Sequence, residues 1–142
     1  MRIAEIENEI IEEFELFGDD WEGKYEHLID FGNHLPLIEK QHKTDDKLIK
    51  GCQSRVWLRA ELHSEKVFFT ADSDAIITKG IVAILSRVFS GQTPEEIMQA
   101  DLKFIDDIGL KEHVSRTRAN GLVSMIKQIK MYAIALNLSQ NS

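Results

Sequence analysis

The sequence predicts an α+β fold in which a small antiparallel β-sheet is flanked by helices, with an N-terminal helical hairpin and a long C-terminal helix. Alternating apolar and polar residues, the period of a strand, occur in one contiguous stretch near residues 55–71. Helical spacing occurs on both sides of it, and strands that do not alternate with helices exclude a doubly wound sheet. With 142 residues the chain is expected to form a single domain, 1–142.

The N-terminal third predicts two helices. The first has an apolar face with spacings of three and four and ends at Gly18; the face consists of Ile3, Ile6, Ile10, Phe14 and Phe17. Asp19 and Asp20 are candidate N-caps of the second helix, which continues until Gly32 and Pro36 interrupt the pattern. Its expected apolar face consists of Trp21, Tyr25, Leu28 and Ile29.

The middle of the chain predicts a β-hairpin. Residues 39–50 are polar except for Leu48 and Ile49, which indicates a loop feeding a short strand with Gly51 and Cys52 at its end. A turn at residues 63–64 separates two strand-like runs, and a second run covers residues 67–71. The apolar face of the first run consists of Val56, Leu58, Ala60 and Leu62.

Three more helices are expected after the hairpin. An apolar helix over residues 76–88 stops at Gly91, and the cluster Asp72-Ser73-Asp74 before it is typical of capping residues. Thr93-Pro94-Glu95-Glu96 is a capping box with proline at the first helical position, which starts a short helix ending before residue 102. The closing helix covers about residues 115–138, with Lys127 and Lys130 directed outward; its apolar face consists of Leu122, Met125, Ile126, Ile129, Ala133 and Leu136.

Charge, apolar segments and cysteine content limit the partners and the cellular compartment that we expect for the chain. Twenty-four acidic against 17 basic residues give a formal charge of −7, which disfavours nucleic acid and anionic membrane surfaces as partners. The N-terminus lacks an apolar signal core and the apolar runs are too short to span a bilayer, so we expect a cytoplasmic protein. A single cysteine cannot form an internal disulfide.

Cys52 is the main candidate for chemistry. A lone cysteine is more often a small buried residue, but Cys52 follows Gly51 in a polar loop, and the nearby cations Lys50 and Arg55 would favour its thiolate form. The five histidines show no metal-ligand spacing with Cys52.

Other polar and aromatic side chains have ordinary structural explanations. We interpret Asp72 and Asp74 as helix caps and Arg118 as a solvated charge on a helix, whereas Trp57 and Phe69 are expected in the core.

Several blocks of the sequence together resemble one family. Residues 51–57 have the sequence Gly51-Cys52-Gln53-Ser54-Arg55-Val56-Trp57. This block is similar to the signature of the SufE family, sulfur acceptors that act with cysteine desulfurases in iron–sulfur cluster assembly. Four further blocks, in the order of the family between residues 21 and 129, also resemble it: Trp21-Glu22 with Lys24-Tyr25 and Leu28-Ile29, Ala71-Asp72-Ser73 with Lys79-Gly80, residues 91–97, and residues 118–122. Ser115-Arg116-Thr117-Arg118 departs from the family because it lacks a proline before the closing helix.

The resemblance implies a SufE/IscU-like fold with the acceptor cysteine on a loop at one edge. It implies that Cys52 carries a persulfide, that Gly51, Gln53, Ser54, Asp74 and Arg118 support the loop or the docking of a partner, and that this chain needs no cofactor. The implied partners are a cysteine desulfurase, SufS-like or CsdA-like, which holds the pyridoxal phosphate (PLP), and a downstream cluster scaffold. The blocks are shared by SufE and the similar acceptor CsdE and do not distinguish them.

Two alternatives remain at the level of sequence. An IscU-like scaffold would have a similar fold, although a cluster normally needs four protein ligands and this chain has one cysteine. A cysteine-dependent enzyme for a small molecule would need a base fixed beside Cys52.

Overall fold

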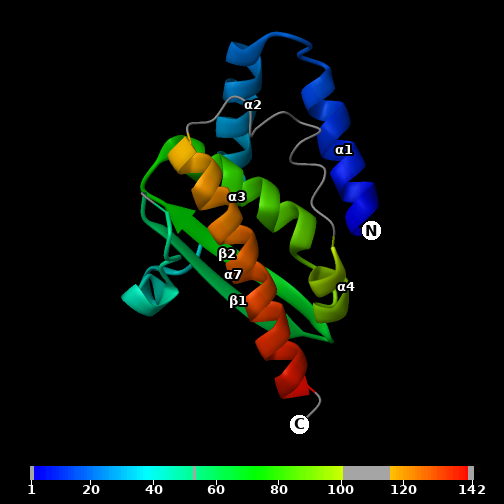
Figure 1. Cartoon of the computed structure of the whole chain (residues 1–142), viewed down its shortest axis with the longest axis vertical. Coiled ribbons are helices and arrows are strands. Elements are labelled where there is room, and N and C mark those ends of the chain that lie inside the picture. The colour runs from blue at the N-terminus through cyan, green and yellow to red at the C-terminus, as the bar shows by residue number, and fades with distance from the viewer. Residues whose placement is uncertain (1, 53, 101–115, 141–142) are drawn as a thin grey trace.

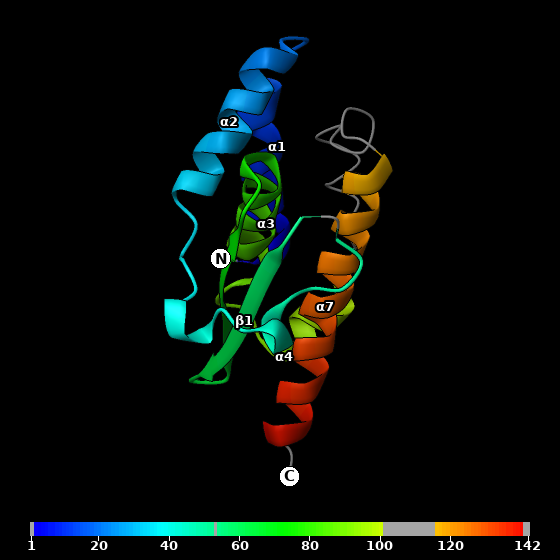
Figure 2. The ribbon, with the colours of Figure 1, turned by 90° about the vertical axis from the view of Figure 1, so that its left-hand side faces the viewer.

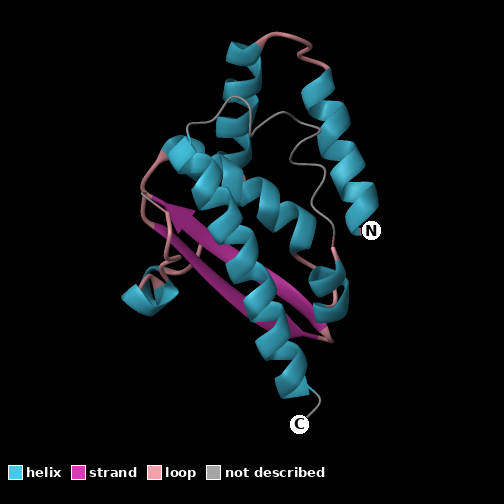
Figure 3. Cartoon of the chain, in the orientation of Figure 1, coloured by secondary structure: helices cyan, strands magenta, loops and turns pink. Residues whose placement is uncertain are grey.

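The computed structural model describes residues 2–52, 54–100 and 116–140, and it confirms the α+β class. Helices pack around one two-stranded antiparallel sheet (Figures 1 and 3). In Figure 2, α2 lies on one side of the molecule and α7 on the other, with α3 and the sheet between them. The elements, in chain order, are α1 (Ile3–Glu15), α2 (Trp21–Asn33), the short helical turns η1 (Lys40–His42) and η2 (Asp45–Lys47), β1 (Val56–His63), β2 (Lys66–Ser73), α3 (Ile76–Phe89), α4 (Pro94–Gln99) and α7 (Arg116–Gln140).

The N-terminal helical hairpin is confirmed. Asp20 caps α2 as expected, because its carboxylate accepts a hydrogen bond from the Gly23 amide at 3.0 Å. Two boundaries differ from the prediction: α1 already ends at Glu15, and α2 continues through Gly32 to Asn33. Gly32 lies inside α2, at the crossing with α3. A β-carbon there would come within 3.2 Å of the Gly80 amide nitrogen. The glycine therefore serves a close approach of two helices.

Two faces of α1 and α2 build this part of the core. The buried side chains of α1 are the predicted Ile6, Ile10 and Phe14. In α2, Leu28 and Phe31 are buried, whereas the predicted Trp21, Tyr25 and Ile29 are only partly buried. The buried face of α2 is therefore centred further toward its C-terminus than the spacing indicated.

The β-hairpin is confirmed, with Leu58 opposite Ala71 and Ala60 opposite Phe69. Its turn residues Ser64 and Glu65 both have positive φ, as a tight two-residue hairpin turn requires. Because directly paired residues share a face of the sheet, one face is apolar and packs into the core. It consists of Val56, Leu58, Ala60, Leu62, Val67, Phe69 and Ala71.

The segment before the hairpin differs from the prediction. Instead of a loop feeding a short strand, it contains η1 and η2, and the expected strand is reduced to one bridge between Leu48 and Trp57. The Ile49 amide donates to the Val56 carbonyl oxygen at 2.9 Å, and the chain then turns away at Gly51. A single bridge is enough to fix where the Cys52 segment leaves the sheet.

The acidic cluster before α3 does not cap that helix, so the capping interpretation of Asp72 and Asp74 is wrong. The N-cap of α3 is Ala75, which has no side-chain capping hydrogen bond. Asp74 instead accepts from the Arg55 amide at 3.0 Å, and Asp72 pairs with lysines. The strands separate at this end of the hairpin and leave backbone amides without a partner on the other strand. The carboxylates of Asp74 and Asp72 accept hydrogen bonds from the amides of Arg55 and Ser73 there.

The C-terminal helices follow the prediction closely. Thr93 and Glu96 form the capping box of α4, and α7 buries Leu122, Met125, Ile129 and Ala133. One expectation is wrong: Lys130 does not point to solvent but donates to the Ala100 carbonyl oxygen at 2.8 Å. Within the described ranges, no helix combines the length and hydrophobicity needed to cross a membrane.

Candidate functional site

Cys52 lies on the segment that connects η2 to β1. This segment runs along α7 before it enters the sheet (Figure 2). The side chain of Cys52 is half-buried and packs against the edge of the hydrophobic core. The sequence thus places the one thiol of the chain where the polar loop, the start of β1 and α7 meet.

Gly51 allows the Cys52 segment to lie this close to α7. Gly51 has a φ of +94°, and a β-carbon there would overlap the hydroxyl group of Ser124. On the helix side Gly121 lies beside Cys52, but a β-carbon there would make only an ordinary van der Waals contact, 3.5 Å from the Cys52 sulfur. A backbone of this shape favours glycine at position 51, because other residues rarely adopt positive φ. We call this contact of Gly51 and Cys52 with Gly121 and Ser124 the thiol latch.

The latch also determines the state of the thiol. The Cys52 sulfur donates to the Gly121 carbonyl oxygen at 3.5 Å, a contact available only to the protonated form. Burial raises the pKa of Cys52. The expectation that Lys50 and Arg55 favour the thiolate is therefore wrong in this conformation: both side chains are exposed, and burial dominates.

Asp74 belongs to the support of the Cys52 loop. Its carboxylate accepts from the Arg55 amide at 3.0 Å, and its own amide donates to the Arg55 carbonyl oxygen at 3.3 Å. The Ser73 hydroxyl donates to the same carbonyl at 2.8 Å. These bonds fix the backbone three residues after Cys52, so the loop is anchored at Arg55 and held by the latch at Gly51.

The remaining predicted site residues are only partly described. Ser54 is half-buried beside the loop. Gln53 lies outside the described residues, and for Arg118 the structure gives its place in the first turn of α7 but no side-chain contact. Sequence reasoning assigned no role to Gly121 and Ser124. A glycine inside a helical pattern is the signal that could have indicated a close backbone approach at Gly121.

A second polar cluster holds the η1 segment on the outer face of the sheet. Lys43 lies 4.4 Å from the centre of the Trp57 ring and 2.9 Å from the Asp72 carboxylate, and Lys79 lies 3.5 Å from the same carboxylate. Trp57 is therefore half-buried beneath a lysine and not in the core, whereas Phe69 is buried as expected. Burial opposes the charge of Asp72, but hydrogen bonds from Lys43 and Ser73 with the two lysine charges lower its pKa overall.

The surroundings of Cys52 limit the chemistry available to it. Within the ranges that the structure describes, its sulfur is hydrogen-bonded to a backbone carbonyl, and neither a histidine nor a carboxylate is hydrogen-bonded to it. The same ranges contain no group of three or more His, Cys, Asp or Glu residues arranged to hold a metal ion. The arrangement thus holds a half-buried, protonated thiol against α7.

Comparisons with known proteins show the family and the fold of the chain. Residues 8–133 match the sequence model of the family described as SufE, Fe-S metabolism associated domain. A relative from Rhizobium meliloti (strain 1021), described as an uncharacterized SufE-like protein, is 40% identical over 131 residues, covering 89% of this chain and 93% of the relative. The solution structure of a hypothetical protein from Thermus thermophilus superimposes with a TM-score of 0.76 over 92% of this chain and 94% of that one. At 17% identity this likeness supports the fold alone.

Proposed function

The chain belongs to the SufE family, whose domain is associated with Fe–S metabolism, and we propose that it accepts sulfur on Cys52 and relays it toward iron–sulfur cluster assembly. One observation carries the proposal: the only thiol of the chain lies half-buried on a loop, and its sulfur donates to the Gly121 carbonyl oxygen of α7 at 3.5 Å. A thiol that only filled the core would be fully buried and would need no such loop.

The proposed reaction is transpersulfuration. The Cys52 thiolate attacks the outer sulfur of a persulfide on the donor's cysteine, and a sulfur–sulfur bond forms at Cys52. The sulfur–sulfur bond of the donor breaks, and the donor cysteine leaves as a thiolate. One sulfur atom changes hands with no net oxidation or reduction, so the step needs no cofactor in this chain.

The resting thiol is a poor nucleophile, and this gives the latch a role. Burial and the Gly121 contact favour the protonated form, whereas attack requires the thiolate. We therefore expect docking of the donor to release Cys52 from α7. A return of the Cys52 loop to α7 after transfer would shelter the persulfide from reductants and oxidants, although its inner sulfur no longer carries the proton that the Gly121 hydrogen bond needs.

The partner of this reaction is a cysteine desulfurase that holds pyridoxal phosphate and forms the donor persulfide. The chain would activate it by clearing that persulfide and would deliver the sulfur to a cluster scaffold in the cytoplasm. The segment around Cys52 and Asp74 is the proposed docking face, because Asp74 sets the backbone on which the Cys52 loop is anchored. Arg118 is included in the proposed docking face only because residues 118–122 resemble a sequence block of the family.

The two alternatives need groups beyond this thiol. A cysteine-dependent enzyme needs a base beside the sulfur, and in the described ranges the sulfur is bonded to a carbonyl oxygen. An IscU-like scaffold needs several cluster ligands, and the sequence supplies one cysteine. Visible absorbance of the protein after reconstitution with iron and sulfide would support the scaffold alternative.

The decisive experiment is sulfur transfer measured on the intact chain. The protein is incubated with a candidate desulfurase and L-cysteine, and mass spectrometry measures the sulfur added to Cys52. We expect one additional sulfur, removable by a reductant, and a faster desulfurase turnover in the presence of the chain. Cys52→Ser should lose both effects.

A second variant controls for sulfur released into solution. The double variant Cys52→Ser with Glu95→Cys places the single thiol on an exposed position of α4, away from the loop. If sulfur is added to the cysteine at position 95 as fast as to Cys52 in the unmodified chain, the reaction is nonspecific and the proposed site is refuted. Hydrogen exchange of residues 50–55 that is unchanged by the desulfurase would refute the release of the loop.

A further inference from the structure

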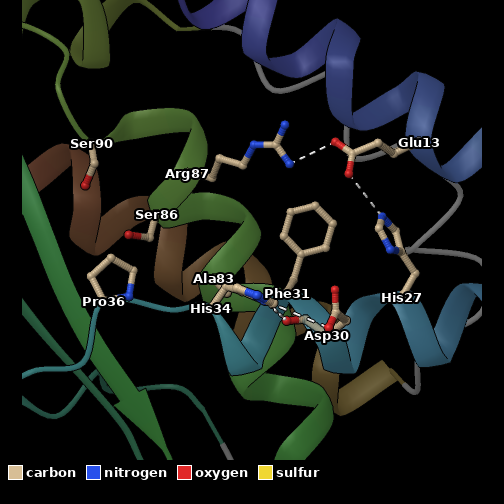
Figure 4. A pocket seen from close by; sticks show the side chains of 10 residues that line it. All are labelled: Glu13, His27, Asp30, Phe31, His34, Pro36, Ala83, Ser86, Arg87 and Ser90. Atoms are coloured by element: carbon tan, nitrogen blue, oxygen red, sulfur yellow. Dashed lines mark hydrogen bonds and ion pairs between the residues drawn. The ribbon is translucent and has the colours of Figure 1, made fainter.

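A pocket of about 350 Å³ lies between α1, α2 and α3, on a side of the molecule that shares no residue with the thiol latch (Figure 4). Its volume falls within the range of small-molecule sites, which begins at about 300 Å³. The pocket is lined by Glu13, His27, Asp30, Phe31, His34, Pro36, Ala83, Ser86, Arg87 and Ser90. The proposed sulfur transfer gives this pocket no role.

The centre of the pocket is apolar. The Phe31 ring occupies the middle of the view in Figure 4, with Ala83 to its lower left and Pro36 further to the left. Phe31 and Ala83 are buried in the core, so this surface is fixed by the packing of α2 on α3. A preformed apolar surface of this kind suits the hydrocarbon part of a ligand.

The acids of the pocket differ in how well they are neutralised. Glu13 is paired with Arg87 at 2.8 Å and faces His27 at 3.4 Å, and the other terminal nitrogen of Arg87 binds Glu9 at 3.3 Å. Arg87 is therefore already engaged by two carboxylates.

Asp30 is the less compensated acid. Among the described residues, its carboxylate pairs with the ring of His34, at 3.8 Å. Both side chains are largely exposed, that of Asp30 by 63% and that of His34 by 77%. The His34 ring nitrogen already interacts with the Asp30 carbonyl oxygen at 2.9 Å. The carboxylate of Asp30 can thus accept a further donor at the edge of the apolar surface.

The field around the pocket selects the charge of a ligand. Helix α1 carries six glutamates and no lysine or arginine. Glu13 lines the pocket, and Glu9 pairs with the lining residue Arg87. An anion would be repelled by this helix and would compete with two glutamates for Arg87, whereas a cation is attracted.

We propose that the pocket binds a small organic amine, with its ammonium group at Asp30 and its apolar body on Phe31, Ala83 and Pro36. Phe31 contributes only apolar surface, because the Arg87 guanidinium already lies over its ring, 5.4 Å from the ring centre. This site is independent of sulfur transfer and would persist if the role of Cys52 were refuted.

Three probes of similar size and different charge test the proposal on the full chain. Phenethylamine, 2-phenylethanol and phenylacetate are titrated in the millimolar range while amide NMR shifts are recorded. We expect phenethylamine to shift amides of residues 27–36 and 83–90 most strongly and phenylacetate to shift them least. Equal shifts with all three probes, or no shifts at these residues, would overturn the proposal.

A pair of charge-neutralising variants on α2 separates the site from general attraction. Asp30→Asn removes the proposed ammonium partner, and Glu26→Gln removes the same charge from an exposed position of the same helix. Asp30→Asn should weaken phenethylamine binding about threefold, as expected for an exposed ion pair, while Glu26→Gln leaves it nearly unchanged. Equal weakening in both variants would show nonspecific attraction and would contradict the assignment to this pocket.

Discussion

Replacing Gly51 by alanine should open the thiol latch without unfolding the protein. At a φ of +94° a β-carbon is disfavoured by the backbone, and here it also overlaps the Ser124 hydroxyl. The backbone cost alone is about 1–2 kcal/mol. Because the segment is anchored at Ile49 and Arg55 on the sheet, the strain can be relieved by detaching residues between these two points.

The magnitude follows from the share of molecules with an open latch. A cost of about 1.4 kcal/mol corresponds to a factor of ten in an equilibrium constant. If alkylation proceeds through the open state, Gly51→Ala should react with iodoacetamide about tenfold faster than the unmodified chain. The assay reports on the latch directly, because the chain contains one cysteine.

A second glycine provides the matched control. Gly18 also has a positive φ, +54°, but a β-carbon there would have no neighbour within 4 Å, and the residue lies in the turn between α1 and α2. Gly18→Ala should lower stability modestly and leave alkylation of Cys52 unchanged. The reasoning about the latch fails if Gly51→Ala reacts no faster than Gly18→Ala, or if its faster reaction is fully explained by global unfolding measured in urea.

Three further predictions concern titration and capping. Alkylation of Cys52 should rise with pH through a midpoint above the value of about 8.5 for free cysteine, because burial raises its pKa, and this displacement should vanish in denaturant. Thr93→Ala should cost about 1 kcal/mol in urea unfolding by removing the capping box with Glu96; an unchanged midpoint would contradict its contribution. The pKa of Asp72 is lowered, so its stabilising contribution is present above the unfolded value of about 3.9 and is lost as the pH falls through the folded value. Asp72→Asn should therefore weaken the acid dependence of the unfolding midpoint, and an unchanged acid dependence would contradict this contribution.

Local sequence patterns predicted most of the elements, because their causes lie within a few residues. The capping box at Thr93 and the N-cap at Asp20 form hydrogen bonds three residues away, which a short stretch of sequence contains in full. The alternation through β1 likewise identified the buried face of the sheet. The acids before α3 were misassigned because Arg55, the partner of Asp74, lies 19 positions away and Lys43, a partner of Asp72, lies 29 positions away.

The family and the residue with the candidate chemistry were determined by the sequence alone, because ordered blocks and a single cysteine are properties of the chain in one dimension. The state of that cysteine was decided by the tertiary structure. Lys50 and Arg55 are close to Cys52 along the chain, but Gly121 is the residue that receives its hydrogen bond, 69 positions away. Desolvation depends on what packs against the sulfur, so packing against α7, and not the neighbouring charges, sets the direction of its pKa.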